Sequence, residues 1–97
     1  MKFYTSHQIA IHSAIADAGY SKDQFSFSKK KGRIIISRTD VEDVFFSFIE
    51  KRESTLDPVK MRVMDKFSYF ISENGAKEEL VDNWDEVLSK FNSWLIN

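Results

Sequence analysis

The spacing of the apolar residues changes twice along this chain, and that change constrains the fold most. Near both ends, apolar residues recur every three to four positions, as on one face of a helix. Between residues 25 and 72 they either alternate with polar residues or form short runs rich in Val, Ile and Phe, and both patterns are typical of strands. The 97 residues are therefore expected to form a single α+β domain. We predict an antiparallel meander sheet of three to four strands, flanked by an N-terminal helix and a longer C-terminal amphipathic helix.

The N-terminal helix is predicted over residues 5–19. Its apolar face contains Ile11, Ala14, Ile15 and Ala18. Gly19 follows, and glycine commonly ends a helix in a left-handed turn. The C-terminal helix is predicted over residues 76–97, although Asn83 could cap a later start. Its stripe keeps the helical period for four turns: Leu80, Trp84, Val87, Leu88, Phe91, Trp94 and Leu95.

The stretch FSFSKKKGRIII, residues 25–36, predicts a β-hairpin. Phe25 and Phe27 alternate with serines, which is typical of a strand with one buried face. The three isoleucines that end the stretch are β-branched and favour a second strand. Lys31 and Gly32 lie between the two runs, and glycine tolerates the positive φ of a hairpin turn.

The middle of the chain leaves its secondary structure open. Residues 43–54 fit a helical stripe, but their Val and Phe content favours a strand buried on both sides. Residues 60–72 alternate well enough to predict another strand, although Asp57 and Pro58 could instead begin a helix. We therefore interpret residues 40–72 as strands, with helices as the alternative.

Composition narrows the classes of function. The chain has no cysteine, which excludes disulfides, thiolate nucleophiles and cysteine-ligated metals. The formal net charge is −1, so bulk charge calls for neither nucleic acid nor a membrane surface. No apolar run suggests a signal peptide or a membrane span. We expect a cytoplasmic protein, and the small size and the richness in Lys, Asn, Ile and Phe suggest a bacterium or phage.

No catalytic or metal-binding set stands out. His7 and His12 lie about 140° apart around the predicted helix, so a shared metal is not expected. The acidic pairs cluster in turns and at helix starts, where carboxylates are favoured without catalysis. The three glycines stand alone and form no phosphate-binding loop. We therefore expect no enzyme activity, no metal and no cofactor.

Two surfaces remain as candidates for partner contacts. The first is the basic hairpin tip, formed by Lys29, Lys30, Lys31 and Arg33. The second is the aromatic edge of the last helix, formed by Trp84 and Trp94, because Trp is favoured at binding hot spots. We expect a non-catalytic protein-interaction module, an adaptor, regulator or inhibitor, that docks on a protein partner through this edge or an exposed strand. A homodimer is one form of this hypothesis. Weak nucleic-acid binding through the tip at 29–33 is the alternative, which we favour less than a solvated tip.

Overall fold

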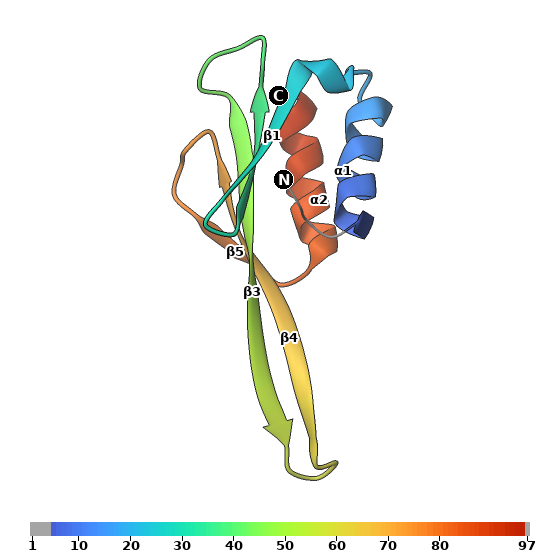
Figure 1. Cartoon of the computed structure of the whole chain (residues 1–97), viewed down its shortest axis with the longest axis vertical. Coiled ribbons are helices and arrows are strands. Elements are labelled where there is room, and N and C mark those ends of the chain that lie inside the picture. Colours follow the sequence, from blue (N-terminus) through green and yellow to red (C-terminus); the bar gives the residue numbers. More distant parts are fainter. Residues whose placement is uncertain (1–4, 97) are drawn as a thin grey trace.

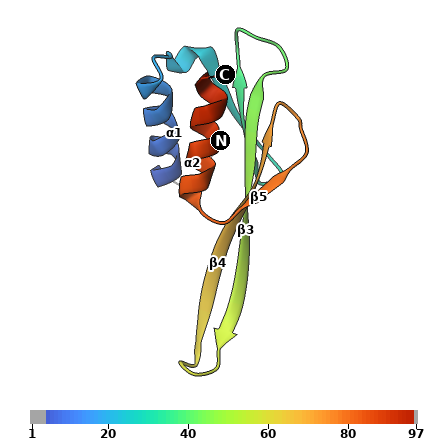
Figure 2. The ribbon, with the colours of Figure 1, turned by 180° about the vertical axis from the view of Figure 1, so that it is seen from behind.

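The computed structural model of this chain describes residues 5–96 and has an α+β fold (Figure 1). The elements in chain order are α1 (Thr5–Asp17), the short 3₁₀ helix η1 (Lys22–Gln24), β1 (Phe25–Lys30), β2 (Arg33–Arg38), β3 (Phe45–Asp57), β4 (Arg62–Glu73), β5 (Glu79–Val81) and α2 (Trp84–Ile96). The five strands form one antiparallel sheet in the order β1-β2-β3-β4-β5. Both helices cover the same face of that sheet (Figures 1 and 2). The predicted fold class, an antiparallel meander between two helices, is confirmed.

Two details of the prediction need correction. The sheet has a fifth strand, β5, in a segment that we had assigned to the start of the C-terminal helix. The helix begins at Trp84 instead, because the side chain of Asn83 accepts a hydrogen bond of 2.9 Å from the backbone N–H of Glu86. Among the described residues α1 and α2 have 13 residues each, so neither helix is the longer there.

The hairpin over residues 25–36 is confirmed. Lys31 and Gly32 form its two-residue turn, with φ of 52° and 84°. Positive φ at both positions is the pattern of a type I′ turn, whose twist matches that of the flanking strands. The register pairs Lys30 with Arg33 and Phe27 with Ile36, which directs Phe27 and Ile36 to the same face.

The strand interpretation of residues 40–72 is also confirmed, because this segment forms β3, a turn and β4. The expected burial on both sides of β3 holds for only part of it. Phe46 and Phe48 are buried under α2, and Ser47 is buried on the opposite face. From Lys51 onward the side chains of β3 are mostly exposed.

The hydrophobic core lies between the sheet and the helices. Phe46 of β3 meets Phe91 of α2 edge to face, with ring centroids 5.2 Å apart, and both side chains are fully buried. Ile11 and Ile15 of α1 complete this layer, as their helical spacing predicts. Ala18, which we placed on the same face, is exposed because α1 ends at Asp17 and the chain turns away through Gly19.

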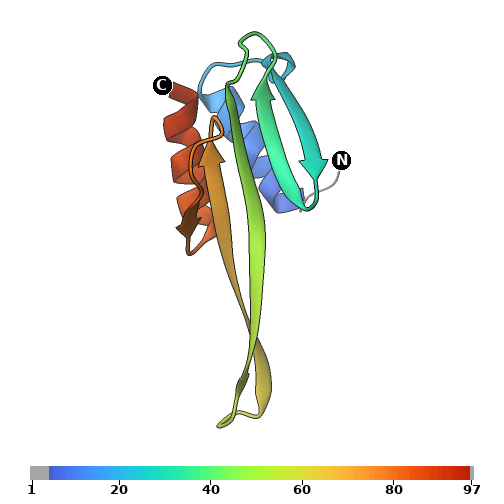
Figure 3. The ribbon, with the colours of Figure 1, turned by 90° about the vertical axis from the view of Figure 1, so that its left-hand side faces the viewer.

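The strands β3 and β4 extend far beyond the helices that cover them (Figure 3). Residues 51–67 of this hairpin, which we call the arm, account for the elongated shape of 53 × 25 × 24 Å. The arm is paired along its whole length, from Lys51 opposite Ser68 to Asp57 opposite Arg62. It is therefore a regular two-stranded ribbon rather than an irregular loop.

Truncating the centre of the core tests this arrangement. We expect Phe46→Ala to lower the free energy of unfolding by about 3–5 kcal/mol, because it leaves a cavity against Phe91. Urea unfolding followed by circular dichroism measures the change. The control is Ile9→Ala, at an exposed apolar position of α1, which should change stability by less than about 0.5 kcal/mol. Equal effects of the two substitutions would contradict the assigned core.

Candidate functional site

The arm carries most of the apolar surface that the described part of the molecule exposes. Six of its ten exposed large apolar side chains lie between residues 56 and 67. They are Leu56, Val59, Met61, Val63, Met64 and Phe67. Val59 at the tip is 89% exposed and Met61 is 78% exposed. Scattered apolar residues on a surface are ordinary, whereas concentrations of them are typical of interaction surfaces in other proteins.

Polar contacts connect the two strands of the arm. Asp65 of β4 accepts hydrogen bonds from Ser54, at 2.6 Å, and from Arg52, at 2.7 Å, both across the ladder on β3. These contacts, first that with Ser54 and then that with Arg52, lower the pKa of Asp65. At the tip, the carboxylate of Asp57 accepts from the backbone N–H of Val59 at 3.0 Å. The apolar side chains are thus presented on an ordered hairpin.

A shallow groove runs beside β4 where the arm leaves the domain. One wall is formed by arm residues, including Met64 and Phe67. The other wall is the connection from β5 to α2, with Asp82, Asn83 and Trp84. Figures 1 and 2 show this connection next to β4 at the base of the arm. The groove therefore joins the apolar surface of the arm to the domain.

The predicted basic tip is at the end of the β1–β2 hairpin. Lys29, Lys30 and Lys31 are exposed there, and within residues 5–96 they form no ion pair. Arg33 differs from them, because it forms an ion pair with Glu78 and donates a hydrogen bond of 3.2 Å to Ser47. The charge available to an outside partner is therefore smaller than the four residues suggest.

The two tryptophans are in different environments. Trp94 is buried and only 7% exposed, and its indole N–H donates a hydrogen bond of 3.1 Å to the side chain of Asn74. Trp84 is half-buried and stacks on His7, with ring centroids 3.8 Å apart. Only Trp84 lines the groove beside the arm. The stripe of α2 mainly serves as the core face.

Asn74 has a structural role that the sequence analysis did not assign. We interpreted Asn74 and Gly75 as a turn, and both have positive φ. The side-chain oxygen of Asn74 also accepts a hydrogen bond of 2.9 Å from the backbone N–H of Phe45. Together with the contact to Trp94, this bond ties the start of β3 to α2. An Asn-Gly pair alone signals a turn, and no local pattern indicates the two additional hydrogen bonds of Asn74.

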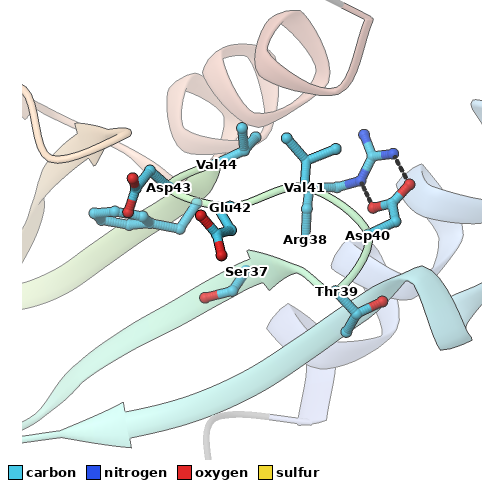
Figure 4. Close-up of a pocket in the computed structure, with 9 residues that line it drawn as sticks. Ser37, Arg38, Thr39, Asp40, Val41, Glu42, Asp43 and Val44 are labelled. Carbon is cyan, nitrogen blue, oxygen red and sulfur yellow. Dashed lines mark hydrogen bonds and ion pairs between the residues drawn. The ribbon is translucent and has the colours of Figure 1, made fainter.

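The loop from β2 to β3 surrounds a second hollow, lined by residues 37–45 (Figure 4). Arg38 donates two hydrogen bonds to Asp40, of 2.9 and 2.7 Å. Hydrogen bonding by Arg38 is the main cause that lowers the pKa of the Asp40 carboxyl. The guanidinium also lies 4.8 Å from the ring centre of Tyr20. Arg38 is therefore engaged in contacts within the chain, and these contacts explain its position beside the hollow without a ligand.

Residues 5–96 contain no group of three or more His, Cys, Asp or Glu residues that could hold a metal ion. His7 stacks on Trp84, and His12 packs against Phe27 with ring centroids 5.0 Å apart. No helix within this range is both long and apolar enough to cross a membrane.

Comparisons with protein-family models, with curated proteins and with solved structures found no match. The fold and the surface of the chain itself therefore carry the functional argument.

The environment of His7 leads to a pH prediction. Burial lowers the pKa of His7 below 6.5, and Glu50 partly opposes this effect. The folded state therefore binds the proton less readily than the unfolded state, so stability present above pH 6.5 is lost as the pH falls through the lowered pKa. We expect the unfolding free energy of the natural chain to fall more steeply below pH 6.5 than that of His7→Gln. Urea titrations between pH 7.5 and 5 measure this difference, and parallel curves would contradict it.

Proposed function

We propose that this protein is a non-catalytic protein-interaction module that docks through the arm formed by β3 and β4. The observation that carries the proposal is the concentration of exposed apolar side chains on a hairpin that extends past its helices. An adaptor, a regulator or an inhibitor could each act in this way. The mechanism is surface docking, with no bond made or broken in the partner.

Two physical properties of the arm support this role. Apolar side chains on an ordered ribbon can be buried by a partner with a smaller entropic cost than those of a flexible segment. The ribbon also offers strand edges, which can accept an added strand from a partner through backbone hydrogen bonds. Val59 and Met61 at the tip would then fill apolar pockets.

The other candidate surfaces have less support. Burial of Trp94 in the core leaves Trp84 as the accessible part of the aromatic edge, and Trp84 adjoins the arm through the groove. The lysines of the basic tip remain open to solvent, so nucleic-acid binding stays an alternative. Three lysines on a chain of net charge −1 are weak support for nucleic-acid binding. The exposed apolar side chains of the arm support a protein partner more strongly.

A capture experiment with matched variants tests the proposal. The natural chain and the double variant Val59→Ser with Met61→Ser are immobilised and exposed to extract from the native host. We expect a specific partner whose affinity for the double variant is lower by about tenfold or more, because hot-spot side chains contribute about 2 kcal/mol or more. The affinity is then measured by calorimetry with the purified partner.

The control for this experiment is Ile9→Ser, which alters an exposed apolar residue of α1 away from the arm. It should bind like the natural chain. Equal binding by the natural chain and the arm variant would contradict docking through the arm.

A further inference from the structure

The outer edge of β4 is an open strand edge along the arm. β5 pairs with β4 only at residues 69–71. Among the strands of the described chain, none pairs with residues 62–68 on this side. After Val81 the chain leaves the sheet and enters α2 at Trp84. The ladder that β5 begins therefore stops where the arm begins.

The backbone hydrogen bonds show which groups of β4 face this edge. The N–H of Asn74 donates to the carbonyl of Phe45, so these residues form a hydrogen-bonded pair at the end of the β3–β4 ladder. Hydrogen-bonded pairs of an antiparallel ladder recur at every second residue, and the register is continuous through the arm. Even-numbered residues of β4 therefore bond to β3. Val63, Asp65 and Phe67 instead direct their N–H and C=O groups to the open edge.

The groove beside the arm runs along this edge. Its lining includes Met64, Asp65, Lys66 and Phe67, which alternate between the two faces of β4. A hollow that is lined from both faces of a strand lies at the edge of that strand. Trp84 belongs to the other wall, at the start of α2. An extended segment in the groove would thus meet the open backbone groups of β4 on one side and Trp84 on the other.

An added strand would meet two different environments on the face of β4 that carries Phe67 and Asp65. Opposite Phe67, which is 40% exposed, its side chain would lie between this ring and that of Trp84, which suits an apolar or aromatic group. Opposite Asp65 it would meet a carboxylate. This carboxylate accepts one hydrogen bond from Arg52 and one from Ser54, and its two oxygens have room for further donors.

The charges around the groove favour a basic segment. Asp82 lines the groove, and Asp85 and Glu86 follow in the first turn of α2. Within residues 5–96 none of these three carboxylates forms an ion pair. Lys66 is the one basic residue among those that line the groove in the described chain, and it lies on the other face of β4, opposite Glu53. Lysine or arginine side chains of a partner would therefore complement the acidic excess.

Two alternatives have less support. Copies of β4 that pair antiparallel about residue 65 or 66 place Asp65 opposite Asp65 or Lys66 opposite Lys66, and like charges in direct opposition destabilise a strand pair. The other edge of the arm, on β3, carries four successive charged residues at positions 50–53. Charged side chains on an edge discourage pairing with another strand. A basic strand from a different protein at the edge of β4 is therefore favoured.

We infer that the open edge of β4 takes an extended segment of the partner protein as an added antiparallel strand. This segment has an apolar or aromatic residue opposite Phe67 and a lysine or arginine opposite Asp65. The inference rests on the proposed function and gives the chemical class of its partner. Backbone pairing supplies affinity, and the two side-chain positions supply specificity. The added strand is antiparallel to β4 because it continues the ladder of β5.

A synthetic peptide with this pattern tests the inference without altering the protein. When acetyl-TYTKTVT-amide lies antiparallel to residues 62–68, its tyrosine is opposite Phe67 and its lysine is opposite Asp65. The peptide is titrated into isotope-labelled protein, and the amide signals are followed by NMR. We expect saturable shifts at residues 62–68 and 82–84. The control acetyl-TYTETVT-amide should bind about fivefold more weakly or less, because its glutamate opposes Asp65.

Two N-methylated forms of the lysine peptide test the backbone pairing. Methylation of the lysine N–H removes the hydrogen bond to the carbonyl of Asp65. Methylation of the threonine that follows alters an N–H that points away from β4, so this peptide is the matched control. We expect the first form to bind about tenfold more weakly than the unmethylated peptide and the second to bind within about twofold of it.

Asp65→Asn tests the charge from the side of the protein. The preference for the lysine peptide over the glutamate peptide should fall from about fivefold to about twofold or less. Asp23→Asn, at an exposed acid of η1, is the matched control and should keep the full preference. An unchanged preference in Asp65→Asn would contradict the assigned position of the basic residue.

The outcomes separate this inference from the proposed function. Equal affinity for the two N-methylated peptides, or for the lysine and glutamate peptides, overturns the inference, as does the absence of shifts at residues 62–68 with millimolar peptide. Shifts of these amides that depend on the concentration of the protein alone would place a second copy at the edge and also overturn it. If the inference fails while Val59→Ser with Met61→Ser still weakens capture of a partner, the proposed function stands. If the peptides bind as expected while that variant captures partners like the natural chain, the proposed function fails and the edge site stands.

Discussion

The difference in length between the helices and the central strands determines the rest of this structure. A helix rises about 1.5 Å per residue, so 13 residues reach about 20 Å. A strand rises about 3.4 Å per residue, so the 13 residues of β3 reach about 43 Å. Helices of this length can cover only about half of β3 and β4. The uncovered half is the arm, and its apolar side chains find no core within the described chain.

Because the helices are shorter than the strands, apolar residues at alternate positions of β4 are buried in one half of the strand and exposed in the other. Tyr69 and Ile71 of β4 are buried under the helices, whereas Val63 and Phe67 on the same face are exposed. The exposed half keeps its strand form through backbone pairing and the contacts of Asp65 with Arg52 and Ser54. The molecule is thus a stable domain with a projecting ribbon. The domain positions the ribbon, and the ribbon presents the candidate interaction surface.

Much of the fold could be predicted from the sequence because local rules agree with the tertiary structure. The period-two pattern of residues 60–72 predicted β4, and the Lys31-Gly32 turn predicted the first hairpin. β5 could not be predicted, because three residues are too few to show a period and Leu80 also fits a helical stripe. The exposure of the arm could not be predicted either. Alternation identifies the face of a strand, but the length of the covering helix decides how much of that face is buried.

Sequence patterns also could not show which candidate site residues are buried or paired, because that depends on tertiary contacts. Trp94 and Trp84 belong to one helical stripe, yet the sheet beneath α2 buries the first more fully than the second. Arg33 belongs to the basic run, but its ion pair with Glu78 depends on a contact 45 residues away in the chain. The arm was outside our sequence-based candidates because its apolar residues resembled core residues. Only the position of the helices distinguishes an apolar strand that is covered from one that is free to bind.

The central proposal is that the protein docks on its partner through the arm, which the helices leave uncovered. Amide hydrogen exchange of the chain alone and of the chain with the captured partner tests it most directly. We predict that amides of the arm become more protected when the partner is bound, while those of the core strand segment at Phe46 and Phe48 do not change. Equal exchange of the arm in the two samples would contradict the account.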